Sequence, residues 1–366
     1  MFIKKLSLKN FRNYEFAEIE FTKNINIMIG NNAQGKTSLI EGIYALSTTK
    51  SHRTSKDIQM IRFEQDFARA DTVVSIPNED DVILSLSIAK KGKTAKYNGI
   101  SVSRLSAYMG KLKTVFFAPE DLELIKGTPT IRRRFLNMEI GQIDSLYIHH
   151  LTSYSKILKQ RNELLKNYIE SESNHLMLEV LTETLIPHLV YLLEKRTWFL
   201  KILEAHAKKV HAFITDSKED ISFKYLNSMK IDEIIGDVLM AKFESLYSND
   251  KRMRTTTIGA HRDDFSVYLS KINAHEFASQ GQQRTSILSI KLAEIDLIYQ
   301  ETGIYPVLLL DDVLSELDES RQSKLLASTN NKAQAFITAT SVSGIYKEIL
   351  DSADVFVIEG GKIDVD

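Results

Sequence analysis

The N-terminal part of the chain alternates apolar and polar residues with a period of two, which is typical of half-buried strands. The segments FIKKLSLKNF at 2–11 and YEFAEIEF at 14–21 show this alternation, and the apolar run INIMIG follows at 25–30. Further along, VVSIP at 73–77 and VILSLSIAKK at 82–91 flank the polar turn NEDD, which predicts a β-hairpin. We therefore expect this part of the chain to be rich in strands.

From about residue 120 to residue 246 the period changes to that of helices, with apolar residues every three or four positions. Position 161, where one face of this pattern should continue with an apolar residue, is Arg161, so the repeat is too short for an extended coiled coil. We expect a helical lobe here. Its near-heptad face consists of Tyr147, Leu151, Tyr154, Leu158 and Leu165.

Strand and helix patterns alternate again after Arg254. We expect a helix at 282–299 and strands at 255–260, 264–269, 306–310, 333–340 and 353–363. Strands that alternate with helices predict an α/β fold with a mixed sheet.

The order of these patterns predicts a discontinuous domain organisation. One α/β lobe is assembled from residues 1–115 and 255–366, and a helical lobe, residues 116–254, is inserted into it.

Composition narrows the chemistry that is available. The chain has 366 residues, 43% of them hydrophobic and 26% charged, which is typical of a soluble globular protein. It contains no cysteine, which excludes disulfides, thiolate metal sites and cysteine nucleophiles. No uninterrupted apolar stretch reaches the length of a membrane span, and the N-terminus lacks the apolar core of a signal peptide. We expect a cytoplasmic protein without a membrane partner.

The net charge of −1 means that any nucleic-acid binding must come from a local basic patch. No Asp or Glu occurs from Val82 to Pro119. Both a solvated hairpin face and a DNA-binding patch fit this segment. The arginine cluster at 132–134 could bind phosphate, or it could be solvated or form salt bridges. The candidate DNA-binding residues are Lys90, Lys91, Lys93, Lys96, Arg132 and Arg133.

A phosphate-binding motif follows the apolar run at 25–30. The segment from Gly30 to Thr37 fits G-x-x-x-x-G-K-[ST], with a predicted strand before it and a predicted helix after it. In such a loop the backbone N–H groups bind the phosphates of ATP, Lys36 neutralises charge, and the Thr37 hydroxyl coordinates Mg²⁺. The predicted ATP-binding residues are Gly30, Asn31, Asn32, Ala33, Gln34, Gly35, Lys36 and Thr37.

Two adjacent acids end the apolar run PVLLL at 306–310. A run of this composition is typical of a buried parallel strand, and ligands bind at the carboxyl ends of such strands. Asp311 is placed to hold Mg²⁺ together with Thr37, and Asp312 to orient or deprotonate the attacking water as the catalytic residue. Acids that only cap the next helix would give the same pattern.

A second candidate anion site opens the helix predicted before that strand. It consists of Ser279, Gln280, Gly281, Gln282 and Gln283. A small polar turn at a helix N-terminus attracts anions. Because the first loop already serves one nucleotide, we expect this turn to contact a nucleotide on another copy of the chain.

These motifs together resemble the ABC-type ATPase heads, a group that includes SMC proteins and the RecF family, and the likeness to the RecF family is close. It extends over nearly the whole chain in the same order. The matching segments are FRNY at 11–14, GNNAQGKTSLIEGIY at 30–44, HRTSKD at 52–57, FFAPEDLELIKG at 116–127, RRRFLN at 132–137, GAHRDD at 259–264, ASQGQQR at 278–284 and LLLDDVLSELD at 308–318.

The resemblance implies an ATP-dependent DNA-binding protein of recombinational repair and replication restart, with weak DNA-dependent ATPase activity. It implies a head-to-head homodimer that forms with ATP on gapped or duplex DNA and loads recombinase with RecO and RecR. Ser279 to Gln283 would be the signature that meets ATP in trans, and Ser315 and Asp318 would belong to the D-loop.

Two positions depart from the resembled patterns. Ala260 stands where RecF proteins usually have proline, which leaves the roles of His261 and Arg262 open. Thr338 to Thr340 occupy the place of the switch histidine of transporter ATPases, which weakens that alternative. Two alternative functions remain. The first is the nucleotide-binding subunit of a transporter, which would bind membrane proteins and not DNA. The second is another SMC-like head, which would need a long coiled coil or a nuclease site, and the sequence shows neither.

Overall fold

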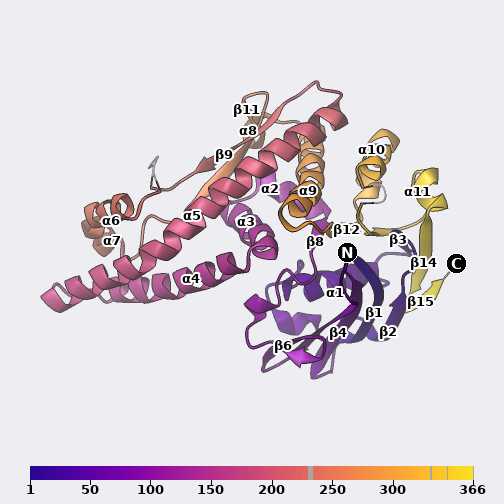
Figure 1. Cartoon of the computed structure of the whole chain (residues 1–366), viewed down its shortest axis with the longest axis horizontal. Coiled ribbons are helices and arrows are strands. Elements are labelled where there is room, and N and C mark those ends of the chain that lie inside the picture. The colour runs from indigo at the N-terminus through magenta and orange to yellow at the C-terminus, as the bar shows by residue number, and fades with distance from the viewer. Residues whose placement is uncertain (230–233, 330–331, 344, 366) are drawn as a thin grey trace. The chain divides into compact units, whose positions relative to one another are not determined.

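A computed structural model describes residues 1–229, 234–329, 332–343 and 345–365 (Figure 1). The chain folds into two compact units, each made of separate stretches of sequence. Unit 1 contains Met1–Asp121, Lys209–Lys218 and Thr285–Asp366, and unit 2 contains Leu122–Lys208 and Glu219–Arg284.

The first sheet of unit 1 is antiparallel, with the strand order β2-β1-β4-β5-β6-β7. The hairpin predicted around NEDD is confirmed, because β4 and β5 pair next to that turn, with Val74 opposite Val82. The strands are β1 (Phe2–Phe11), β2 (Tyr14–Glu20), β4 (Phe67–Ser75), β5 (Val82–Ala89), β6 (Gly92–Tyr97) and β7 (Ile100–Ser101).

The second sheet of unit 1 has the order β15-β14-β3-β13-β12-β8, and all of its neighbours pair in parallel except β14 and β15. The carboxyl ends of β3, β12 and β13 therefore lie along one edge, where α/β proteins bind ligands. The strands are β3 (Ile25–Ile29), β8 (Thr114–Phe117), β12 (Val307–Asp311), β13 (Ala335–Ala339), β14 (Ala353–Glu359) and β15 (Lys362–Val365).

Helix α1 (Lys36–Thr48) contacts strands of both sheets of unit 1. Its apolar residues Leu39, Ile40, Ile43 and Leu46 are buried. Unit 1 also contains α10 (Glu319–Thr329), α11 (Lys347–Asp351) and the 3₁₀ turns η1 (Asp57–Met60), η2 (Leu105–Ala107), η3 (Pro119–Leu122) and η4 (Leu314–Glu316).

Unit 2 combines helices with a small antiparallel sheet in the order β11-β10-β9. Two long helices, α5 and α9, belong partly to each unit. The helices are α2 (Glu123–Lys126), α3 (Pro129–Ile143), α4 (Ser145–Lys166), α5 (Glu172–Thr215), α6 (Gly236–Ser245), α7 (Tyr247–Met253), α8 (Ala274–Phe277) and α9 (Gln280–Thr302), and the strands are β9 (Ile221–Leu226), β10 (Asp264–Leu269) and β11 (Ile272–Asn273).

The structure corrects the predicted lobe boundary at residue 255. Residues 255–284 lie in unit 2, because β10 pairs with β9, for example Phe265 with Tyr225. The inserted lobe is therefore not purely helical. The strand predicted at 255–260 is also wrong, since this segment forms a bend and turn.

Helix α4 buries three residues of the predicted heptad face, Tyr147, Tyr154 and Leu165, and leaves Leu151 and Leu158 half-buried. It also buries the charged residue that interrupts this face. Arg161 is fully buried, and its Nη1 donates to Asp250 Oδ2 at 2.8 Å and to Thr256 Oγ1 at 2.7 Å. A buried charge requires such a partner, and this pair links α4 to α7.

Helix α5 is the one helix in the described part of the chain that is long and apolar enough to cross a membrane. Within unit 2, however, Leu185, Leu189, Leu192 and Leu193 of this helix are fully buried. Pro187 lies inside this helix.

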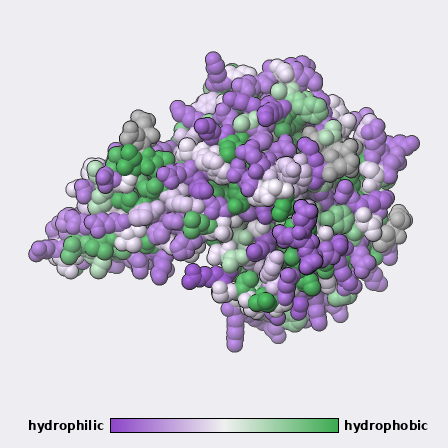
Figure 2. Space-filling view, in the orientation of Figure 1, coloured by the Kyte–Doolittle hydropathy of each residue, from purple (hydrophilic) through white to green (hydrophobic). Residues whose placement is uncertain are grey.

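The surface is mainly hydrophilic on the face that Figure 2 shows, with hydrophobic residues gathered at the end of unit 2 that carries α6 and α7. Val238 and Met253 are among the exposed apolar residues of these helices.

Candidate nucleotide-binding site

The glycines of the phosphate motif occupy backbone conformations that other residues adopt only with strain. Gly30 has φ 152°, and a Cβ atom there would lie 2.3 Å from the carbonyl oxygen of Ile358. Gly35 has φ 122°, and a Cβ atom there would lie 2.6 Å from both the Tyr14 hydroxyl and Asn13 Nδ2. The motif thus requires glycine at both positions for conformational and steric reasons.

The loop is fastened to distant parts of unit 1. The backbone oxygen of Gln34 accepts hydrogen bonds from Gly361 N at 3.1 Å and Asn13 Nδ2 at 3.0 Å. The Gln34 side chain accepts from Gly360 N at 2.5 Å, and the Tyr14 hydroxyl donates to the Gly35 oxygen at 3.2 Å. The loop geometry therefore depends on the N-terminal strands and on the turn between β14 and β15.

Lys36 lies at the concave side of the loop and is almost fully buried. Its Nζ donates to the backbone oxygens of Gly30 at 2.6 Å and Asn31 at 3.0 Å. The ammonium group is thus held where the N-terminus of α1 adds its own positive potential. This arrangement suits a phosphate group.

Thr37 and Asp311 come together although they are far apart in the sequence. Thr37 Oγ1 donates to Asp311 Oδ1 at 3.0 Å, and Thr338 Oγ1 donates to the same oxygen at 2.7 Å. Burial raises the pKa of Asp311, while the hydrogen bonds from Thr338 and Thr37 oppose that rise. A hydroxyl and a carboxylate are hard oxygen ligands, so the pair fits Mg²⁺.

Asp312 follows β12 in a left-handed conformation, with φ 56°. Its backbone N donates to Thr338 Oγ1 at 2.9 Å, and its side chain lines the same pocket as Lys36. The strained turn therefore separates the two acids, with Asp311 buried at the strand end and Asp312 facing the pocket.

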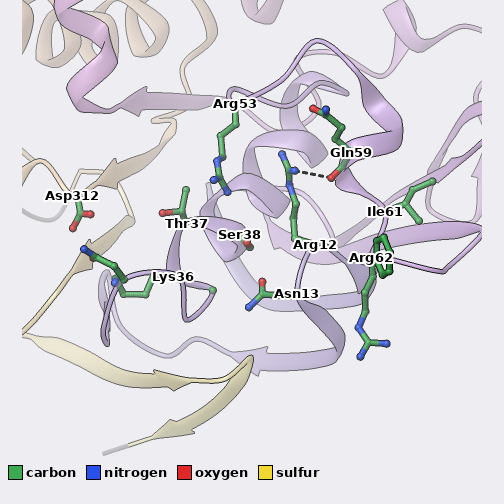
Figure 3. Close-up of a pocket in the computed structure, with 14 residues that line it drawn as sticks. Arg12, Asn13, Lys36, Thr37, Ser38, Arg53, Gln59, Ile61, Arg62 and Asp312 are labelled. Carbon is green, nitrogen blue, oxygen red and sulfur yellow. Dashed lines mark hydrogen bonds between the residues drawn. The ribbon is translucent and has the colours of Figure 1, made fainter.

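The pocket has a volume of about 690 Å³ and runs from the phosphate loop to the loop after α1 (Figure 3). Figure 3 shows Lys36 and Asp312 at one end and Ile61 and Arg62 at the other. It is lined by Arg12, Asn13, Asn32, Ala33, Gly35, Lys36, Thr37, Ser38, Arg53, Gln59, Ile61, Arg62, Phe63 and Asp312.

A fully buried carboxylate, Glu41 of α1, orients two of the pocket arginines. Arg12 donates to it through Nε at 2.7 Å and Nη2 at 2.5 Å, and Arg53 Nη1 lies 3.9 Å from it. Ser51 Oγ donates to the same carboxylate at 2.5 Å. Our sequence reasoning did not identify this network, although Arg12 and Arg53 lie in the segments FRNY and HRTSKD.

The signature segment forms the N-terminus of α9 in unit 2. Gln282 N donates to Ser279 Oγ at 3.3 Å, and Ser279 N donates to Gln282 Oε1 at 2.9 Å. This reciprocal pair is a capping box. Ser279, Gln280 and Gly281 are exposed, whereas Gln283 is buried and its Nε2 donates to the Ala278 oxygen at 2.8 Å.

Comparison with known proteins decides the family. The family model for the RecF/RecN/SMC N terminal domain matches residues 2–362. The "DNA replication and repair protein RecF" of Oceanobacillus iheyensis is 46% identical over 369 residues, covering 99% of this chain and 100% of the relative. The protein of the same name from Bacillus velezensis is 45% identical over 369 residues, covering 99% of this chain and 100% of the relative.

The chain belongs to the RecF family.

Solved structures agree with this assignment. The structure of the recombination mediator protein RecF-ATP in the RecFOR pathway has a TM-score of 0.92 and 32% identity, covering 100% of this chain and 97% of that one. An Smc head domain from Pyrococcus furiosus has a TM-score of 0.55 at 16% identity, covering 100% of this chain and 96% of that one, and shows the fold alone. The predicted fold, an ABC-type ATPase head with an inserted lobe, is confirmed.

The predicted D-loop residues of this RecF-family chain have defined local roles. Ser315 Oγ donates to the backbone oxygen of Asp312 at 2.7 Å, which links the loop to the residue that follows β12. Asp318 accepts from Arg321 N at 2.9 Å near the start of α10. Both residues are exposed.

The candidate DNA-binding residues differ in their exposure and in their contacts within the protein. Lys90, Lys91 and Lys96 are exposed. Lys93, in contrast, donates to the Thr49 oxygen at 2.6 Å and pairs with Asp57 at 2.8 Å.

The arginine cluster is also partly occupied by internal contacts. Arg132 is buried in a two-point ion pair with Asp264, at 2.6 and 2.8 Å. Arg133 Nη1 donates to the Asp263 oxygen at 2.8 Å.

The segment GAHRDD of this RecF-family chain is held from inside unit 2. His261 Nδ1 lies 2.8 Å from the Tyr154 hydroxyl, and its Nε2 lies 3.2 Å from the Thr256 oxygen. Burial lowers the pKa of His261 to about 4. The imidazole is therefore neutral near pH 7, and both of its ring nitrogens lie within hydrogen-bond distance of unit 2 residues.

Proposed function

We propose that this RecF-family protein binds ATP with Mg²⁺ and, in that state, binds DNA in recombinational DNA repair and replication restart. The observation that carries the proposal is that Lys36, Thr37 and Asp312 line one pocket, and that Thr37 is hydrogen-bonded to the buried Asp311. The pocket offers a cation, metal-ligating oxygens and a free carboxylate, which are the groups that phosphoryl transfer from ATP requires.

The phosphates of ATP would lie in the loop from Gly30 to Thr37, next to Lys36. Thr37 and Asp311 would hold Mg²⁺, which when bound neutralises phosphate charge. Asp312 would orient the attacking water and accept its proton, because its side chain faces the pocket and is not buried like that of Asp311.

The signature would complete the site from a second copy. Ser279 is exposed at the N-terminus of the long helix α9, whose dipole favours an anion. ATP would then lie between Lys36 of one copy and Ser279 of the other in a head-to-head dimer. Hydrolysis in such a composite site is slow in a single chain and would release the dimer, and DNA would stimulate it by favouring dimerisation.

DNA would contact exposed basic residues, of which Lys90, Lys91 and Lys96 are candidates, with Arg133 as a weaker one. Lys90 pairs with Asp66, but both side chains are exposed. Lys93 and Arg132 are less suitable, since their ion pairs hold both side chains largely buried. Phosphate contacts predict an affinity that falls steeply with salt. RecO and RecR would be the partners with which the protein loads recombinase in the cytoplasm.

Sedimentation of the purified chain with and without ATP, Mg²⁺ and gapped DNA tests this proposal. We expect a monomer without ATP, a dimer with ATP, and co-sedimentation of the dimer with DNA. Ser279→Arg should bind ATP as a monomer and fail to dimerise, whereas Lys36→Met should lose nucleotide binding itself. A Ser279→Arg chain that still dimerises with ATP would exclude the composite site, and ATP-independent DNA binding would exclude the nucleotide dependence.

A further inference from the structure

Strand β13 is fully buried, and Thr338 is the polar residue in it. The other residues of this strand are Ala335, Phe336, Ile337 and Ala339. Thr338 is 1% exposed and does not line the nucleotide pocket. A buried hydroxyl group costs free energy unless it is hydrogen-bonded, and valine would fill the same space without that cost. The hydroxyl group of Thr338 therefore requires an explanation.

Both hydrogen bonds of the Thr338 hydroxyl involve the acids at the end of β12. Strands β12 and β13 pair in parallel, with Asp311 opposite Thr338. Thr338 Oγ1 donates to Asp311 Oδ1 at 2.7 Å and accepts from the backbone N of Asp312 at 2.9 Å. An ionised carboxylate only accepts and a backbone N–H only donates, so the hydroxyl proton points at Asp311. One oxygen atom thus connects the acid proposed to bind the metal with the acid proposed to orient water.

The two contacts restrict the two acids in different ways. Thr37 Oγ1 donates to the same oxygen of Asp311, Oδ1, at 3.0 Å, and Oδ2 accepts no hydrogen bond from the described residues. Two donors on one oxygen restrict the rotation of the carboxylate and leave Oδ2 for a metal ion or its water. Asp312 has φ 56°, a conformation that costs a non-glycine residue free energy, and the hydrogen bond to Thr338 holds its backbone there.

We propose that Thr338 is a positioning residue for ATP hydrolysis, whose hydroxyl group holds the Asp311 carboxylate and the turn at Asp312 in the arrangement that the metal ion and the attacking water require. The proposal rests on the roles proposed above for the two acids and adds the residue that links them. Thr338 acts through these acids and does not touch ATP, because it is buried and lies outside the pocket lining. Loss of the link should therefore slow hydrolysis more than it weakens ATP binding.

Thr338→Val tests this role, because valine fills the space of threonine without a hydroxyl group. Small displacements of catalytic groups slow reactions strongly, so kcat should fall about 10- to 100-fold, measured in single turnovers at saturating ATP and Mg²⁺. The dissociation constant of ATP without Mg²⁺, measured by calorimetric titration, should stay the same, because Lys36 and the phosphate loop are unchanged. Thr338→Ser keeps the hydroxyl group and should recover most of the rate.

Amide hydrogen exchange supplies a readout that depends neither on hydrolysis nor on a bound metal. In the nucleotide-free wild-type chain the N–H of Asp312 is protected by its hydrogen bond to Thr338. Its exchange should become faster in Thr338→Val and return toward the wild-type rate in Thr338→Ser. Thr72→Val is the matched control, because Thr72 is also 1% exposed and its Oγ1 donates to the Lys5 oxygen at 2.8 Å. This control should keep the wild-type kcat and the wild-type exchange at Asp312.

A double variant shows whether Thr338 acts through the acids. Asp312→Asn removes the charge of the carboxylate and should itself reduce kcat. Thr338→Val added to Asp312→Asn should then reduce kcat by a much smaller factor than Thr338→Val does in the wild-type chain. A residue that only stabilises the fold would reduce kcat by the same factor in both chains.

The outcomes distinguish this role from the proposed function. If Asp312→Asn hydrolyses ATP at the wild-type rate, the role proposed for Asp312 is wrong, and the role of Thr338 with it. If Asp312→Asn is slow but Thr338→Val keeps the wild-type kcat, or Thr338→Ser is as slow as Thr338→Val, only the role of Thr338 is overturned. Should circular dichroism show an altered fold for Thr338→Val, Thr338→Ala removes the same hydroxyl group and must give the same loss of rate.

Discussion

Helices α1 and α9 both present their N-termini to a proposed phosphate site, but the two ends are built differently. Among the described residues, no side chain caps α1, whose N-cap is Gly35. The first turn of α9 is capped by its own residues, through the reciprocal hydrogen bonds of Ser279 and Gln282. An uncapped helix end leaves its amide groups to a ligand, whereas a capped one is stable by itself and offers mainly its hydroxyl.

The two units also differ in the interactions that stabilise them. In unit 1 the loop before α1 depends on closely packed glycines. Gly30 packs against the backbone of Ile358 in β14, and Gly35 against the side chains of Asn13 and Tyr14. In unit 2 the interior contains charged residues that form ion pairs with one another, such as Arg161 and Asp250. The stability of unit 1 should therefore be sensitive to side-chain volume added at the glycines, and the stability of unit 2 to the loss of one member of a buried ion pair.

The largest effect should come from Asp250→Ala in unit 2. The substitution leaves Arg161 buried without its carboxylate and removes the acceptor of Thr257 N and Oγ1. Breaking a buried pair in this way costs about 3–5 kcal/mol. Denaturant unfolding should show this loss in unit 2.

The control for that variant is Asp66→Ala, which breaks an exposed pair with Lys90 at 2.8 Å. Surface pairs contribute little, so this variant should unfold close to the wild-type midpoint. Equal effects of the two substitutions would contradict the role of the buried pair.

A somewhat smaller effect is expected for Gly30→Ala in unit 1. The added Cβ atom would lie 2.3 Å from the backbone oxygen of Ile358, which cannot move without shifting β14. We expect about 3 kcal/mol of destabilisation and loss of ATP binding, measured by denaturant unfolding and calorimetric titration. Gly92→Ala is a matched control, because Gly92 has φ 137° and no atom within 4 Å of its Cβ position. If both variants behave alike, the close packing is unimportant.

Unit 1 could be predicted from the sequence further than unit 2. Its strands show plain alternation, and the phosphate motif and the acids at 311 and 312 are local patterns that stay together in the fold. The Glu41 network could not be predicted, since a glutamate on a helix is usually exposed, and only the tertiary structure brings Arg12 to it.

Unit 2 was less predictable because its organisation depends on long-range pairing. The strand β9 is short and lies within a helical region, and only its pairing with β10 identifies it and moves the boundary to Arg284. The segment at 255–260 is rich in β-branched residues, which are common in strands, yet Thr256 serves as a buried partner of Arg161. The sequence pattern predicted that the apolar face of this helix ends at Arg161, but the Arg161 side chain is fully buried in the core.

Acidification should weaken unit 2 through His261. Its pKa in the folded protein is lowered by burial to about 4, so between pH 4 and about 6.5 the unfolded chain binds more protons. The stabilising effect of the neutral imidazole is thus present above pH 6.5 and is lost as the pH falls. We expect about 1.5 kcal/mol less stability at pH 5 than at pH 6.5 from this group.

The comparison variant for this prediction is His261→Gln, which keeps hydrogen-bonding groups near Tyr154 and Thr256 but does not titrate. Denaturant unfolding at both pH values should show a smaller loss for the variant than for the wild-type chain. The same loss in both chains would mean that other groups cause it.

The smallest effect on stability, with the largest contrast in function, is expected at Ser279. Aspartate caps a helix as well as serine does, so Ser279→Asp should change the free energy of unfolding by only about 0.3 kcal/mol. Ser279→Ala loses the cap and should cost about 1 kcal/mol. In ATP the order should reverse: the added carboxylate repels the phosphate of the partner's nucleotide, so Ser279→Asp should dimerise less than Ser279→Ala. If dimerisation instead follows the capping order, Ser279 acts only as a helix cap, and the difference between the two helix ends has no bearing on the ligand.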